Sequence, residues 1–95
     1  MHGPLFKVRL RLAVREKLES ENPGLTRRQV RARMDEVTNK MIAKAVKDAG
    51  AQEAVMALET GVGAIGDGAI LKAIMDFLKS DLGQALIKII LGFLI

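Results

Sequence analysis

The chain contains no cysteine, no tryptophan and no tyrosine, and only three phenylalanines and one histidine. Without cysteine it can form no disulfide, no thiolate metal site and no cysteine nucleophile. The histidine, His2, has no second metal ligand near it in the sequence, so nothing supports a metal site. With so few aromatic residues, the core must be built from Leu, Ile, Val, Met and Ala, which favours helices over a β-sandwich.

Residue arrangements typical of enzymes are also missing. Ser20 and Ser80 have no histidine to activate them. Asp35 and Glu36 are adjacent and would point in different directions on a helix, unlike a paired acid and base. Residues 61–66 spell G-x-G-x-x-G, but a dinucleotide fingerprint needs a preceding strand, and the segment before them is typical of a helix. We therefore predict a non-enzymatic protein with no catalytic residue, cofactor, metal or small-molecule substrate.

Charge is distributed unevenly along the chain. Residues 1–48 contain 12 basic and 6 acidic residues, whereas residues 49–95 contain 3 basic and 5 acidic residues. Such a basic half predicts an anionic partner, either nucleic acid or a lipid headgroup surface; the alternative is a solvated face that binds nothing. Residues 7–17 are strongly charged and no apolar run follows them, so we expect no secretory signal peptide.

The first 60 residues are predicted to form a basic helical head. Its helices are expected at about 8–20, 26–49 and 51–60. Residues 5–12 also alternate between apolar and charged side chains, so a strand or extended arm there is the alternative.

Turn and capping residues mark the limits of these helices. Pro23-Gly24 is typical of a tight turn, because glycine accepts a positive φ. Thr26, with Gln29 three residues later, forms a capping-box pattern that begins the next helix. Gly50 should end or bend that helix.

The C-terminal part of the chain is glycine-rich at first and then strongly apolar. Residues 61–68 contain four glycines, which are unfavourable within a regular helix, and are predicted to form a hinge. Residues 69–95 are predicted to form one long helix, in which Gly83 and Gly92 mark places where it can kink. Its polar side chains fall near one helical line: Lys72, Asp76, Lys79, Ser80, Asp81, Gln84 and Lys88.

A helix that is apolar over most of its circumference has to be buried. This one carries too many charges for a lone transmembrane span, which leaves a membrane interface, copies of itself, or the head as its cover. The apolar stripe of the head covers only one face, so we favour self-association. The candidate oligomerisation or membrane-facing residues are Ile70, Leu71, Ile74, Phe77, Leu78, Leu82, Leu86, Ile89, Ile90, Phe93 and Leu94.

The basic residues of the head are candidates for contact with nucleic acid or another anion. They are Arg9, Arg11, Arg27, Arg28, Arg31, Arg33, Lys40, Lys44 and Lys47. Arginine at this density can neutralise phosphates, although no aromatic residue lies among these positions to stack on unpaired bases. Solvation or ion pairing within an assembly is the alternative.

We therefore predict an all-α fold of three or four helices, with a head at 1–60, a hinge at 61–68 and a long apolar helix at 69–95. The predicted function is a structural or assembly subunit, such as a minor capsid, vertex or internal protein of a phage virion, that forms a homo-oligomer or joins other subunits. The alternatives are a small membrane-active protein, such as a holin-like pore former, and a small nucleic-acid-binding protein. The expected location is a virion or a cytoplasmic assembly, with membrane association as the alternative.

Overall fold

The computed structural model describes residues 3–60 and 67–94, and these ranges contain six helices and no strand. The helices are α1 (Gly3–Glu21), α2 (Arg27–Asp35), α3 (Asn39–Asp48), α4 (Gln52–Thr60), α6 (Asp67–Lys79) and α7 (Asp81–Leu94). The predicted all-α fold is confirmed. The predicted number of three or four helices is not confirmed, because two of the predicted helices are each divided in two.

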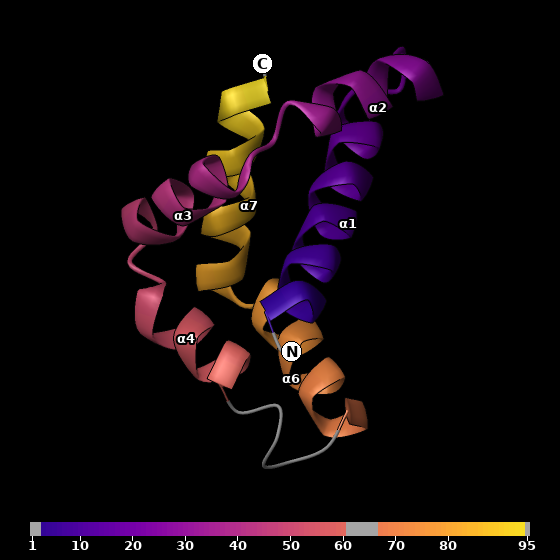
Figure 1. Cartoon of the computed structure of the whole chain (residues 1–95). Helices are drawn as coiled ribbons and strands as arrows, with labels where there is room; N and C mark the ends of the chain where they lie inside the picture. Colours follow the sequence, from indigo (N-terminus) through magenta and orange to yellow (C-terminus); the bar gives the residue numbers. More distant parts are fainter. Residues whose placement is uncertain (1–2, 61–66, 95) are drawn as a thin grey trace.

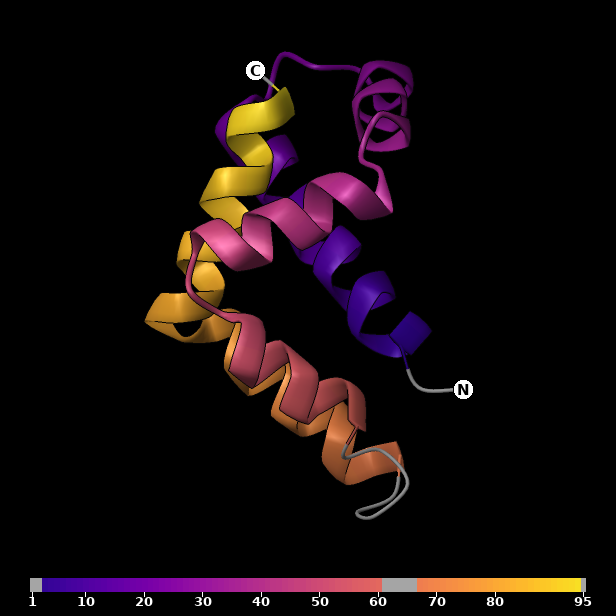
Figure 2. The same cartoon turned by 60° about the vertical axis from the view of Figure 1, so that its left-hand side comes forward.

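Helix α7 lies at the centre of the bundle and packs against α1, α3 and α6 (Figure 1). Helix α4 lies alongside α6 (Figure 2). Helix α2 packs against α1 at one end of the molecule (Figure 1). The head of the same chain therefore covers much of the apolar C-terminal segment, through contacts of α1, α3 and α4 with α6 and α7. No helix in the described part of the chain combines the length and apolarity needed to span a bilayer.

Helix α1 supplies one side of the core through residues at helical spacing. Phe6, Leu10, Val14 and Leu18 recur every four residues, and all four are buried. The rings of Phe6 and Phe77 lie with their centroids 6.0 Å apart at a tilted angle. The alternative of a strand at residues 5–12 is wrong, because Gly3–Glu21 is helical. A strand would place Val8 and Leu12 on the same face as Phe6 and Leu10, whereas both are exposed.

The helix predicted over residues 26–49 is interrupted between α2 and α3. Thr38 is extended, with φ −96° and ψ 163°, and its hydroxyl accepts a hydrogen bond from the Met41 N–H at 3.2 Å. This is the geometry of an N-cap, which begins a new helix at Asn39. The break buries Val37 between the two helices and lets α3 change direction to lie across α7. Gly50, at φ +71°, then ends α3 as expected.

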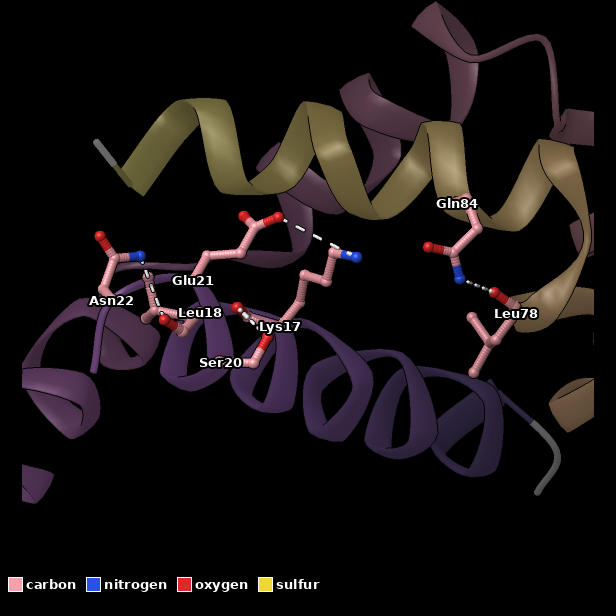
Figure 3. A network of polar contacts seen from close by, with 7 residues as sticks. All are labelled: Lys17, Leu18, Ser20, Glu21, Asn22, Leu78 and Gln84. Atoms are coloured by element: carbon pink, nitrogen blue, oxygen red, sulfur yellow. Dashed lines mark hydrogen bonds and ion pairs between the residues drawn. The ribbon is translucent and has the colours of Figure 1, made fainter.

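The helix predicted over residues 69–95 is divided at Ser80. The Ser80 hydroxyl donates to the Phe77 carbonyl and accepts from the Gly83 N–H, so it ends α6 and caps α7. Gln84 Nε2 also donates to the Leu78 carbonyl at 2.7 Å across the corner (Figure 3). The two halves of the apolar segment can therefore pack against each other, and a single long helix is not formed.

The predicted hinge at residues 61–68 is described only in part. Residues 61–66 lie outside the described ranges, whereas Asp67 and Gly68 belong to the first turn of α6.

Candidate nucleic-acid interface

Helix α2 presents three arginines to solvent at the edge of the bundle. Its buried residue is Val30, whereas Arg27, Arg28 and Arg31 are exposed. The predicted capping box is present: the Gln29 N–H donates to Thr26 Oγ1 at 3.1 Å, and the Thr26 N–H donates to Gln29 Oε1 at 2.8 Å. These two bonds satisfy donors at the start of the helix and fix the position from which the guanidinium groups project.

The arginines at the start of α2 do not serve its stability. Arg27 and Arg28 occupy the first turn, where the partial positive charge of the helix dipole disfavours another cation. No acidic side chain stands in that turn to offset them. The helix dipole and the first turn of α2 therefore give these two arginines no favourable partner.

Helix α3 carries three more cations on its solvent side. Lys40, Lys44 and Lys47 are exposed and recur at helical spacing. The opposite side of the helix buries Ile42, Ala45 and Val46 in the core. We refer to α2 and α3, with their six exposed cations Arg27, Arg28, Arg31, Lys40, Lys44 and Lys47, as the basic helix pair.

The basic helix pair carries much of the chain's positive charge, and ion pairs neutralise little of that charge. Residues 26–48 contain seven basic and three acidic residues, a net charge of +4 that equals the net charge of the whole chain. Within the described ranges, both ion pairs lie in α1, at Arg15–Glu19 and Lys17–Glu21. The six cations are thus left without an anionic partner inside the described part of the chain.

Arg33 has a different environment from the other arginines of α2. Its Nη1 donates to the Leu94 carbonyl at 2.6 Å, at the C-terminal end of α7, where the helix dipole is negative. The half-buried Arg33 therefore joins α2 to α7. Sequence spacing gave no sign of this contact, because 61 residues separate the two partners.

The two remaining candidates for anion contact lie on α1. Arg9 and Arg11 are both half-buried and are not part of the basic helix pair. Arg9 lines a hollow between α1, α6 and α7. The structure thus places six of the nine candidates on α2 and α3 as exposed side chains and gives the other three different surroundings.

The candidate oligomerisation residues of α6 and α7 lie mostly inside the bundle. Six are buried: Ile70, Ile74, Leu78, Leu86, Ile90 and Leu94. Four are half-buried: Leu71, Phe77, Leu82 and Ile89. Only Phe93 is exposed, at 37%. Self-association through these residues stays a prediction, and the chain's own core uses most of their surface.

Two hollows are present on the described surface. The first, of about 450 Å³, lies between α1, α6 and α7, and the second, of about 430 Å³, lies between α1, α3 and α4. Among the described residues, no three histidine or acidic side chains come together in a group that could hold a metal ion.

Comparison of the chain with protein-family models, with curated proteins and with solved structures gives no significant match.

Proposed function

We propose that this protein is a non-enzymatic structural subunit of a nucleic-acid-containing assembly, such as a virion, and that its basic helix pair contacts the nucleic acid backbone. One observation carries the proposal: six exposed cations stand on two short helices, with no anionic partner within the described residues. Phosphates along a nucleic acid would supply that partner and release bound counterions.

The chemistry of the basic helix pair favours binding to the backbone over reading of bases. Guanidinium groups such as those of Arg27, Arg28 and Arg31 match phosphate oxygens in a bidentate way. Residues 26–48 contain no aromatic side chain, so they offer no platform on which unpaired bases could stack. We therefore expect binding to duplex DNA or RNA with little dependence on sequence.

The membrane-active alternative has less support. Anionic lipid headgroups would attract the same cations, but a lipid-inserted state would need the apolar faces of α6 and α7. Ile74, Leu86 and Ile90 are buried in the core, so inserting them into lipid would require the bundle to open.

The salt dependence of duplex binding tests the proposal. Fluorescence anisotropy of a labelled DNA duplex is measured at several salt concentrations for the native chain. The same titration is run on the triple variant Arg27→Gln, Arg28→Gln, Arg31→Gln, and on the control Arg15→Gln, Lys72→Gln, Lys88→Gln. The control removes the same charge from exposed positions outside the basic helix pair.

The expected result is a steep loss of affinity with salt for the native chain. If each of the three arginines contacts one phosphate, the α2 variant should lower the slope of log K against log salt by about 2.7. The control should keep the slope within about 1 of the native value. Equal losses in both variants, or a native chain whose affinity is independent of salt, would contradict the proposal.

Anionic vesicles are titrated in parallel, and the protein should bind them more weakly than it binds the duplex. Stronger binding of the protein to vesicles would favour the membrane alternative.

A further inference from the structure

The hollow between α1, α6 and α7 combines apolar lining with positive charge. Two of its apolar side chains stay exposed, Leu12 at 42% and Met75 at 41%. Its charged lining residues are Arg9, Lys17, Lys79 and Glu16. We refer to this hollow as the α1–α6–α7 groove. Its net charge of +2 lies beside apolar surface that water still reaches, which suits an acidic and partly apolar occupant.

The cations of the groove are available to such an occupant. Lys17 projects from α1 toward α7, and its ion pair with Glu21 is long, at 3.9 Å, with both side chains exposed (Figure 3). A pair of this kind contributes little and is readily exchanged for another carboxylate. Within the described residues, Arg9 and Lys79 form no ion pair.

Helix α4 carries a surface with the opposite properties. Met56 is 64% exposed, the largest exposed fraction among the large apolar side chains of the described residues. Glu53 and Glu59 stand three residues before and after it, which places them beside it on the helix. α4 contains no basic residue, so this α4 face presents an apolar side chain between two acids, which together carry a charge of −2. Glu59 is half-buried, and it lines the second hollow with Met56 and with Lys7 of α1. The other side of the helix is fixed to the bundle through the buried Val55.

We propose that the α4 face of one copy of this chain docks into the α1–α6–α7 groove of a second copy. The charges of the two surfaces are opposite in sign, and exposed apolar side chains stand on both. The sizes also agree: α4 has nine residues, or about 13 Å of helix. The stretch of α1 from Arg9 to Ser20 that lines the groove is about 18 Å long.

The two surfaces lie on different parts of the molecule, so the contact is of the head-to-tail kind. The groove is lined by α1, α6 and α7 and by no residue of α4. A contact between two different surfaces repeats from copy to copy and produces a ring or an open chain. The inference deepens the proposed role as an assembly subunit, and it uses none of the six cations of the basic helix pair.

A charge-exchange experiment tests this contact in the absence of nucleic acid. The groove variant, Arg9→Glu with Lys79→Glu, changes the net charge of the groove from +2 to −2. The face variant, Glu53→Lys with Glu59→Lys, changes the α4 face from −2 to +2. Sedimentation velocity is recorded from micromolar to millimolar protein for the native chain, each variant alone and an equal mixture of the two. Circular dichroism checks that each variant is folded.

The native chain should form species larger than a dimer as its concentration rises, with weak affinity because a face of this size buries little area. Each variant alone brings like charges together and should associate at least about tenfold more weakly. The mixture restores opposite charges at every contact and should assemble again. A native chain that stays monomeric, a dimer that grows no further, or a mixture of folded variants that fails to assemble would overturn the inference. Loss of DNA binding would leave these outcomes unchanged, so the two proposals can fail separately.

Discussion

Gly83 is the residue on which the α6–α7 corner depends most directly. A Cβ atom built at this position would lie 2.7 Å from Leu78 Cα and closer still to the Phe77 carbonyl oxygen. Both neighbours are backbone atoms, so they cannot move aside without opening the corner. We expect Gly83→Ala to lower the free energy of unfolding by about 2 to 4 kcal/mol, measured by urea denaturation followed by circular dichroism.

Gly92, on the same helix, provides the matched control for this substitution. A Cβ added there would meet nothing within 4 Å. Since alanine is a better helix former than glycine, Gly92→Ala should leave stability unchanged or raise it by up to about 1 kcal/mol. Equal effects of the two substitutions would show that helix propensity, and not the close approach at the corner, decides the outcome at Gly83.

At the scale of elements, α2 is held to the bundle at two places, through Val30 in the core and through Arg33 at the end of α7. We expect Arg33→Met to lower the free energy of unfolding by about 1 to 2 kcal/mol, because a half-buried charged hydrogen bond is lost. Arg31→Met removes an exposed charge from the same helix and should change stability by less than about 0.5 kcal/mol. Thermal unfolding of both variants measures this difference.

The same two variants should show the reverse order in DNA binding. Arg31→Met should weaken binding and lower the salt slope by about 1, whereas Arg33→Met should leave the slope nearly unchanged while the chain is folded. A larger loss of DNA affinity from Arg33→Met than from Arg31→Met would contradict the structural role assigned to Arg33.

The boundaries of the elements could be predicted only where a local signal decides them. The spacing of Phe6, Leu10 and Val14, and the capping box at Thr26, are local patterns, and both were present in the structure as expected. Thr38 carries only half of such a signal, since Met41 and not an acidic or amide residue stands three positions later. Its cap forms because the break lets α3 lie across α7, which is a tertiary effect.

At the scale of the whole molecule, the main error of sequence reasoning was to treat the head and the apolar segment as separate parts. A straight helix over residues 69–95 would present more apolar surface than the head could cover. The corner at Ser80 folds that surface on itself, and α1 and α3 cover most of what remains. Local periodicity could not indicate this solution, because a continuous apolar pattern fits one helix and two packed helices equally well.

This shared core predicts that residues 1–60 will not fold without the rest of the chain. Ile70, Ile74, Leu86 and Ile90 are almost fully buried in the bundle. Each contributes about 1.5 to 3 kcal/mol through burial, so their sum is comparable to the whole stability of a small domain. The loss of α6 and α7 would also expose the side of α1 that carries Leu10 and the side of α3 that carries Ile42.

The comparison is between the full chain and residues 1–60 in thermal melts followed by circular dichroism and in amide NMR spectra. The full chain should melt in one cooperative transition and give dispersed amide resonances. The fragment should lose helical signal gradually on heating and give a narrow spectrum, because α2, α3 and α4 are too short to be stable alone. A sigmoidal melt and a dispersed spectrum for residues 1–60 would mean that the head has its own core, and that α6 and α7 are free to leave it for a partner.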